Sequence, residues 1–132
     1  MTEASKSVDV SGLFMPPSNK DNDLLAMAKQ CIADSKAYFP RFESEVSSST
    51  GKLLHFAIGM STEANEFLEI MKKIDRGSLD YDDPDVRTKL EKEAVDTLIY
   101  VMNVFGQMGI DPLEAYNEKR NFNNSRFGSM KG

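Results

Sequence analysis

Two pairs of acidic residues stand at three-residue spacing in neighbouring parts of the chain: Glu63 with Glu66, and Glu93 with Asp96. Residues three apart on an α-helix are separated by about 60° around the axis, so each pair shares one face. Two antiparallel helices would bring all four carboxylates together. Such a cluster is costly unless cations neutralise it, and carboxylate oxygens are preferred ligands of Mg²⁺ and Mn²⁺. The spacing therefore predicts a divalent metal site.

The second pair belongs to a segment, residues 84–108, whose apolar residues cover nearly the whole helical circumference. The exception is a narrow polar stripe made of Glu93, Asp96, Tyr100, Asn103 and Gln107. A helix that is apolar on almost every side is expected to be buried, and buried polar groups need partners. The stripe is therefore predicted to lie inside the assembly and to have a functional role.

The positions of proline, glycine and capping residues predict the helices that would carry these groups. We expect helices over residues 23–39, 51–75, 84–108 and 112–122. Asp83 and Asp111 are expected N-cap residues, each followed by a proline at the first helical position. Pro40 ends the first helix, and the polar, serine-rich residues 41–49 are predicted to form a loop. Gly59 would cost about 1 kcal/mol in a helix interior, which indicates a close approach by another helix or by a ligand.

The composition fits one globular domain. The chain has 132 residues, of which 40% are hydrophobic and 28% charged, and these fractions are ordinary for a globular protein. Its net charge of −5 argues against bulk binding to nucleic acid, and no apolar run approaches the roughly 18 residues that a membrane span needs. A single cysteine and a start without signal-peptide character indicate a cytoplasmic protein. We expect an extended or flexible arm over residues 1–22, one all-α domain over 23–128, and a flexible tail over 129–132.

A basic and amide-rich group stands near the end of the last expected helix. It consists of Lys119, Arg120, Asn123 and Arg126. Basic residues suit the macrodipole at a helix C-terminus, but they also suit phosphate oxygens. Together with the four carboxylates, they indicate metal-dependent phosphoryl chemistry on a nucleotide or a similar compound.

Three motifs, in this order, resemble those of the MazG-type, all-α nucleoside triphosphate pyrophosphatases. They are Glu63-x-x-Glu66, Glu93-x-x-Asp96 within EAVDTLIYVMNVFGQMGID, and Lys119-x-x-x-Asn123-x-x-Arg126. The resemblance covers residues 53–127. It implies an all-α, MazG-like fold whose subunits pair into homodimers resembling four-helix bundles, which in many members assemble further into tetramers.

The resemblance implies an enzyme that hydrolyses the bond between the α and β phosphates of a nucleoside triphosphate, releasing the monophosphate and pyrophosphate. The implied metal ligands, for about two or three Mg²⁺ ions that Mn²⁺ could replace, are Glu63, Glu66, Glu93 and Asp96. One carboxylate of the first pair would be catalytic by orienting the attacking water, and Glu66 is favoured over Glu63. The implied phosphate contacts are Tyr100, Lys119, Asn123 and Arg126. Asn103 would reach the sugar or the base.

The base is the feature that the sequence determines least. Resemblance to phage-type members favours a purine nucleotide, dGTP or GTP, whereas pyrimidine substrates such as dUTP or dCTP stay open. Such short chains occur in bacteria and their phages, so bacterial or host cytoplasm is expected. Outside enzymes, the alternative is a non-catalytic helical interaction or regulatory module. A di-iron bundle would need Glu-x-x-His pairs, which the single histidine, His55, does not form. His55 itself is expected to pack or to face solvent rather than to contact a ligand.

Overall fold

The computed structural model describes residues 23–46 and 48–128, and all regular elements in these ranges are helices. They are α2 (Asp23–Tyr38), α3 (Pro40–Glu45), α4 (Ser49–Asp75), α5 (Pro84–Met108) and α6 (Pro112–Phe127). The predicted all-α class is therefore confirmed. The arm and the tail expected at the two ends lie outside the described residues. None of the described helices combines the length and the apolar character that crossing a bilayer requires.

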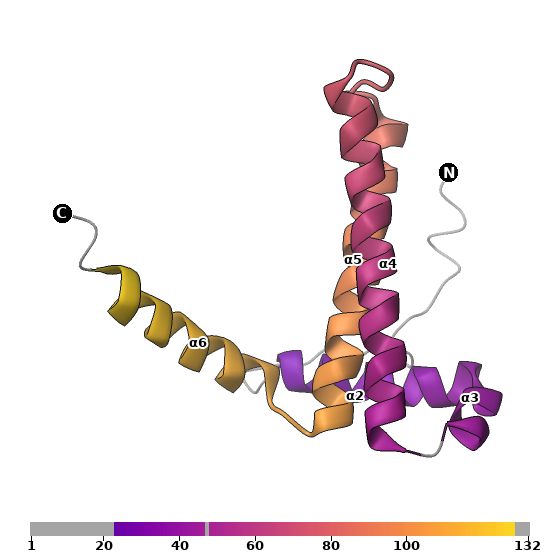
Figure 1. Ribbon diagram of the computed structural model, residues 1–132, viewed down its shortest axis with the longest axis vertical. Coiled ribbons are helices and arrows are strands. Elements are labelled where there is room, and N and C mark those ends of the chain that lie inside the picture. Colours follow the sequence, from indigo (N-terminus) through magenta and orange to yellow (C-terminus); the bar gives the residue numbers. More distant parts are fainter. Residues whose placement is uncertain (1–22, 47, 129–132) are drawn as a thin grey trace.

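The two longest helices, α4 and α5, form an antiparallel hairpin (Figure 1). Beyond α4, Gly77 has a positive φ of 82°, a backbone conformation that glycine adopts without steric cost. Asp83 then caps α5 by accepting a hydrogen bond from the backbone N–H of Asp85 at 2.9 Å, and Pro84 occupies the first turn. Gly109, in the left-handed region with φ 70°, caps the other end. The N-cap residue and the first-turn proline predicted for this helix are confirmed.

Helix α2 packs across α5 near the end of the hairpin that lies far from the connecting turn (Figure 1). The contact is close because α5 carries Gly106 at the crossing. A Cβ atom at this position would lie 2.9 Å from the carbonyl oxygen of Ala28 and would overlap the side chain of Ile32. Ala28 is itself only 1% exposed. The crossing of α2 over α5 therefore requires a residue without a side chain on α5.

Replacing Gly106 with alanine is expected to destabilise the protein by about 1–3 kcal/mol, because an added methyl group would force α2 away from α5. The measurement is the free energy of unfolding in urea. Gly128→Ala is the matched control, since no heavy atom lies within 4 Å of a Cβ placed there and its backbone is already helical. An equal effect of the two substitutions would contradict the packing at Gly106.

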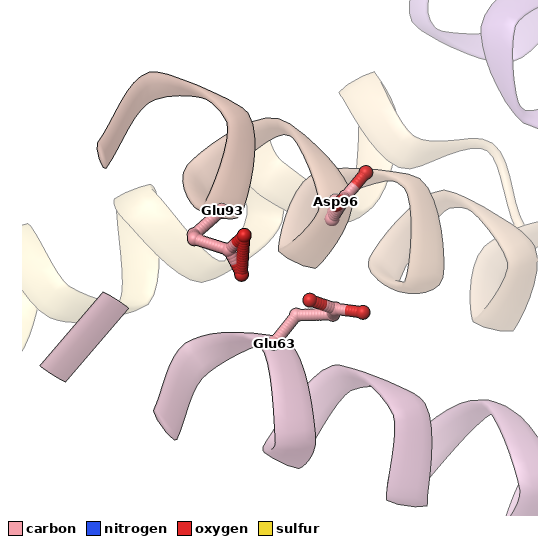
Figure 2. A group of neighbouring side chains, drawn as sticks. All are labelled: Glu63, Glu93 and Asp96. Carbon is pink, nitrogen blue, oxygen red and sulfur yellow. The ribbon is translucent and has the colours of Figure 1, made fainter. Parts of the chain in front are cut away.

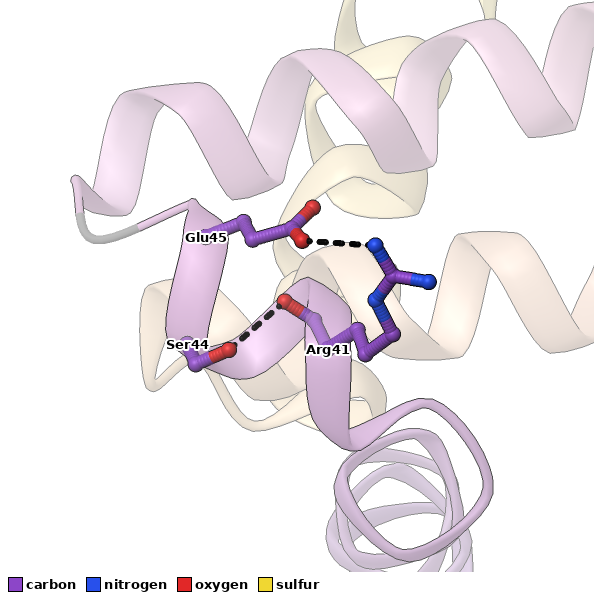
Figure 3. A network of polar contacts seen from close by, with 3 residues as sticks. All are labelled: Arg41, Ser44 and Glu45. Carbon is purple, nitrogen blue, oxygen red and sulfur yellow. Dashed lines mark hydrogen bonds and ion pairs between the residues drawn. The ribbon is translucent and has the colours of Figure 1, made fainter.

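The loop predicted over residues 41–49 is wrong in its first half, where the chain forms α3, a helix of six residues. Pro40, which ends α2, also begins α3, because proline is favoured at the first helical position. Figure 3 shows the polar contacts of this helix: Arg41 donates to Glu45 at 3.3 Å, and the Ser44 hydroxyl donates to the carbonyl of Arg41 at 3.0 Å. Both ionic side chains are exposed, so this pair contributes little to stability.

The stronger reason for α3 is the packing of one aromatic side chain. The ring of Phe42 lies 4.3 Å from the ring of His55 and 5.8 Å from that of Phe56, measured between centroids. Phe56 is 3% exposed and belongs to the small buried core. The contact joins residues that are far apart along the chain, so the local composition of residues 41–49 does not reveal it.

Helix α6 is longer than the predicted segment that ended at Phe122, and it continues to Phe127. Residues 123–127, beyond the predicted end, are helical as well. Basic side chains stack along this part of the helix, with Lys119 lying 4.9 Å from the ring centroid of Phe122 and Arg126 lying 4.3 Å from that of Phe127. Cation–π contacts at exposed positions contribute roughly 0.5–1 kcal/mol each.

The composition of α5 predicts burial on almost every side. Within the described part of one chain, however, several of its apolar side chains are exposed. Val95 is 45% exposed, and Leu98 and Ile99 are each 41% exposed. On α4, Leu54 and Ile58 are exposed as well, at 62% and 58%. The hairpin thus presents a sizeable apolar surface that the rest of residues 23–46 and 48–128 leaves uncovered.

Candidate metal centre and adjoining cavity

Three carboxylates meet between α4 and α5. Glu63 projects from α4, and Glu93 and Asp96 project toward it from α5 (Figure 2). One oxygen atom of each carboxylate lies within 4.8 Å of the oxygens of the other two, and all three residues are half-buried. The predicted convergence across two antiparallel helices is therefore present for three of the four carboxylates. We call these three residues the acidic triad.

The acidic triad has the donor set of a site for a hard divalent cation. Mg²⁺ holds oxygen ligands at about 2.0–2.1 Å, so the ligands of one ion lie at most about 4.2 Å apart. Small changes of side-chain rotamer would bring the three oxygens within that distance. Among the described residues that line the adjoining cavity there is no lysine or arginine to neutralise the triad. The triad could therefore hold a metal ion.

Glu66 lies outside the acidic triad. It is exposed on α4, one turn beyond Glu63. The rotation of α4 about its own axis directs Glu63 at α5 and leaves Glu66, three residues farther on, exposed outside the triad. The role of Glu66 as a metal ligand or as a catalytic group stays a prediction.

The electrostatic environment of the acidic triad acts most strongly on Glu63. Burial raises the pKa of Glu63, and so do a hydrogen bond shared with Glu93 and the negative charges of Asp96, Glu93 and Glu66. An unfolded chain releases this proton near the ordinary value of 4.5, whereas the folded chain retains it to higher pH. The metal-free fold therefore loses stability as the pH rises between these two values. Above them, the ionised Glu63 carboxylate opposes folding.

Glu63→Gln is accordingly expected to raise the thermal midpoint of the metal-free protein at neutral pH, and the gain should disappear as the pH falls below 4.5. Adding Mg²⁺ should stabilise the wild-type protein and leave the variant unchanged, because binding stabilises only a fold that retains its ligands. Thermal unfolding followed by circular dichroism, across pH and with and without Mg²⁺, measures both effects.

The matched control for this experiment is Glu69→Gln on the same helix. Glu69 pairs with Lys72 at 3.1 Å, and both side chains are about half exposed, so a substitution there is expected to have little effect. A metal-free Glu63→Gln protein that is less stable than wild type would show that the ionised carboxylate is favourable in the fold.

The polar stripe of α5 faces α4 along much of the hairpin. Next to the acidic triad, the ring of Tyr100 lies against Gly59, where a Cβ atom would overlap the ring. Farther along, Gln107 donates to the hydroxyl of Ser49 at 3.2 Å. The close approach predicted at Gly59 is therefore confirmed, and the approaching group is the side chain of Tyr100.

A cavity of about 500 Å³ adjoins the acidic triad, and α2, α3, α4 and α5 all contribute to its lining. Its lining includes Glu63 and Asp96 of the triad, together with Tyr100. It also includes an aromatic wall made of Tyr38, Phe39, Phe42, His55 and Phe56. Seven residues of helix, about 11 Å, separate Phe56 from Glu63 along α4. Carboxylate oxygens and aromatic rings thus share one cavity.

Asn103 is the buried polar residue of this cavity, with an exposure of 5%. Its Nδ2 donates to the carbonyl of Ile99 at 3.1 Å. Within the described part of the chain, its Oδ1 atom has no hydrogen-bonding partner. A buried acceptor without a donor costs about 1–3 kcal/mol, so a ligand that offers a donor would be stabilised here.

Three residues of α2 that the sequence analysis did not assign to the site also line the cavity: Cys31, Asp34 and Ser35. Burial raises the pKa of the Cys31 thiol, and the negative charge of Asp34 raises it further. In the sequence, the spacing of Gln30 and Asp34 by four residues could have indicated this part of the site. In the structure, the side chain of Gln30 donates a hydrogen bond to Asp34 at 2.8 Å. A polar pair beside the apolar face of a helix marks a surface that is not simply core.

The structure does not bring the predicted phosphate-binding residues of α6 to the acidic triad within one chain. Helix α6 extends away from the hairpin (Figure 1) and packs mainly on α2. Lys119 lines a second cavity, of about 450 Å³, beside Phe105 and Tyr116. Asn123 is half-buried and Arg126 is exposed. The cationic group and the carboxylate group therefore lie on separate parts of the monomer.

Comparison with known proteins finds no match to a protein-family model, to a curated protein or to a solved structure. The resemblance to the MazG-type enzymes therefore depends on the three sequence motifs alone.

Proposed function

We propose that the protein is a metal-dependent nucleoside triphosphate pyrophosphohydrolase of the MazG-like, all-α type. One observation carries the proposal: three carboxylates converge, and two of them, Glu63 and Asp96, line a cavity with an aromatic wall. Carboxylates suit the cation that accompanies a triphosphate, and aromatic rings suit a base by stacking. A cavity of about 500 Å³ also falls in the range of small-molecule sites, which is about 300–1,000 Å³.

In the proposed reaction, water attacks the α phosphorus, the bond to the bridging oxygen breaks, and pyrophosphate leaves with the electron pair. Bound Mg²⁺, at about two or three ions per site, supplies neutralisation of the triphosphate charge and a water of lowered pKa. Glu63, Glu93 and Asp96 would hold the metal, and Mn²⁺ would substitute. Because Glu66 remains exposed outside the acidic triad, its carboxylate stays available to orient the attacking water and to accept its proton.

Tyr100 and Asn103 would hold the nucleotide between the metal and the aromatic wall. The ring of Tyr100 is fixed against Gly59, and the residue stands one helical turn from Asp96, so its hydroxyl is suited to a phosphate oxygen. The unpartnered Oδ1 of Asn103 is an acceptor, which suits a sugar hydroxyl or a base amino group.

The protein is also proposed to act as a homo-oligomer, a dimer or a dimer of dimers. The support is the apolar surface of the hairpin, where Leu54, Ile58 and Leu98 are exposed within one chain. Exposed apolar patches of this kind mark association surfaces, and a two-helix layer needs a second layer to enclose a core. A cytoplasmic enzyme of a bacterium or of a phage-infected host, acting on the nucleotide pool, would need no membrane and no nucleic-acid partner.

The test is a panel of all ribo- and deoxyribonucleoside triphosphates, each incubated with the protein and Mg²⁺ or Mn²⁺. The products are separated so that monophosphate plus pyrophosphate is distinguished from diphosphate plus phosphate. We expect monophosphate and pyrophosphate in equal amounts, with no release in the presence of a chelator. Absence of pyrophosphate from every nucleotide would reject the proposal and favour a non-catalytic helical module.

A further inference from the structure

The cavity beside the acidic triad offers hydrogen-bond acceptors to its occupant from two helices. On α5, the Nδ2 of Asn103 donates to the Ile99 carbonyl, so flipping the amide would set two oxygens against each other. Its Oδ1, which has no partner in the described part of the chain, is therefore an acceptor. On α2, the Asp34 carboxylate also lines the cavity. Both groups are complementary to a ligand that presents hydrogen-bond donors.

The Asp34 carboxylate is held in place by one hydrogen bond and can still accept others. One of its oxygens accepts from Gln30, one turn earlier on α2, at 2.8 Å, and this bond restricts the side-chain rotamer. A carboxylate has about four lone-pair sites, so most of its accepting capacity remains for a ligand. No lysine or arginine is found among the described residues of the lining, so the charge of Asp34 faces the cavity without a cationic neighbour there.

We propose that the cavity selects a guanine base, and that the Asp34 carboxylate accepts hydrogen bonds from the guanine N1–H and the N2 amino group. The inference rests on the proposed nucleotide function. Guanine carries two adjacent donors on its Watson–Crick edge. Adenine, cytosine, uracil and thymine each direct at least one acceptor at a carboxylate placed there, and two facing acceptors repel. Charge-assisted bonds in a bidentate pair are also among the strongest hydrogen bonds available.

The rest of the lining does not discriminate between bases in the same way. The aromatic wall includes Phe42 and His55, whose ring centroids lie 4.3 Å apart, and stacking on aromatic rings tolerates every base. The Ser35 hydroxyl, next to Asp34 on the cavity lining, can donate to the guanine O6 but can also accept. Asp34 is therefore the residue of the lining that distinguishes one base from another.

The test measures binding rather than turnover. Non-hydrolysable α,β-imido analogues of dGTP, dITP and dXTP, with Mg²⁺, are titrated into the protein in a calorimeter. Hypoxanthine lacks the N2 amino group, and xanthine replaces it with an oxygen atom. In the wild-type protein we expect affinity to fall about 10-fold from guanine to hypoxanthine, and further for xanthine, because one hydrogen bond to a charged group is lost and then replaced by a repulsion.

The variant Asp34→Asn is expected to move the preference toward xanthine by about 100-fold, because its amide N–H donates to the xanthine oxygen while its carbonyl still accepts from N1–H. If Asp34 had only a structural role, Asp34→Asn would lower the affinity for all three analogues alike. The control is Asp23→Asn, at the exposed start of the same helix, which should keep the wild-type order. Helical content by circular dichroism shows that each variant is folded.

The outcomes separate the two proposals. Equal binding of the three purine analogues by the wild-type protein, tighter binding of a pyrimidine analogue, or an Asp34→Asn variant with the wild-type order would each overturn guanine selection. The wild-type series decides the matter even if the variant does not fold. Guanine-selective binding without hydrolysis of dGTP would reject the pyrophosphohydrolase function and leave the base assignment standing. Binding of no nucleotide at all would overturn both.

Discussion

Glu93→Gln is expected to abolish Mg²⁺-dependent release of pyrophosphate, lowering kcat by at least about 10³-fold, because one ligand of a metal centre that stabilises the transition state by several kcal/mol is lost. Glutamine keeps the size and shape of the side chain but offers a neutral and weaker ligand. It also removes a negative charge that faces Glu63 across the hairpin. The variant should therefore stay folded while losing its response to Mg²⁺, and circular dichroism and calorimetric titration with Mg²⁺ measure these two properties.

Asp96→Asn is expected to behave in the same way, since Asp96 stands beside Glu93 on α5 and belongs to the same acidic triad. Glu91→Gln supplies the matched control: Glu91 is on the same helix, is exposed and lies outside the triad. It should retain wild-type turnover and metal affinity. If Glu93→Gln kept the wild-type rate, the assignment of the triad as the metal centre would be wrong.

The ends of the hairpin could be predicted because their signals are local. Asp83 with Pro84 begins α5, and Gly109 ends it, and each acts through backbone groups within a few residues of itself. The short helix α3 could not be predicted in this way. It depends on Phe42 packing against the ring of His55, a contact that exists only after α4 has been placed beside it.

The candidate site could be predicted in part for a similar reason. The spacing of the carboxylates showed that each pair shares one face of a helix, and helix geometry then determined that Glu93 and Asp96 would point together. It could not show that α4 would direct Glu63 toward them and leave Glu66 exposed, because that depends on how α4 is rotated against α5. Asp34 entered the cavity only through the crossing of α2 over the hairpin.

The uncovered apolar surface and the distant α6 together suggest that the site is shared between two chains. Helix α6 extends away from the acidic triad of its own chain (Figure 1) and carries Lys119 and Arg126 with it. Its aromatic side chains are also unusually open, with Tyr116 59% and Phe122 53% exposed. In a symmetric dimer, an extended helix of one subunit can cover the other, and the two contacts are then equivalent. We expect the cationic group of α6 to act on the triphosphate bound by the other chain.

A mixing experiment follows from this arrangement. Glu93→Gln loses the metal centre, and the double variant Lys119→Ala/Arg126→Ala loses the cations of α6, so each is expected to be inactive by itself. When the two are unfolded and refolded together, half of the dimers should contain one subunit of each kind. In such a dimer one site carries both defects, and the other combines an intact triad with an intact α6. The mixture should therefore recover about a quarter of the wild-type activity.

Mixing makes this prediction specific because a site built within one chain gives a different result. If α6 served the acidic triad of its own chain, every site in the mixture would carry one of the two defects, and no activity would return. The control is to refold each variant alone, which should leave both inactive while the protein assembles to the size of the wild-type oligomer, as measured by light scattering. Recovery of activity above the sum of the two separate preparations would show that residues of two chains act on one nucleotide, and it would explain why α6 carries its cations away from the carboxylates that lie on the same chain.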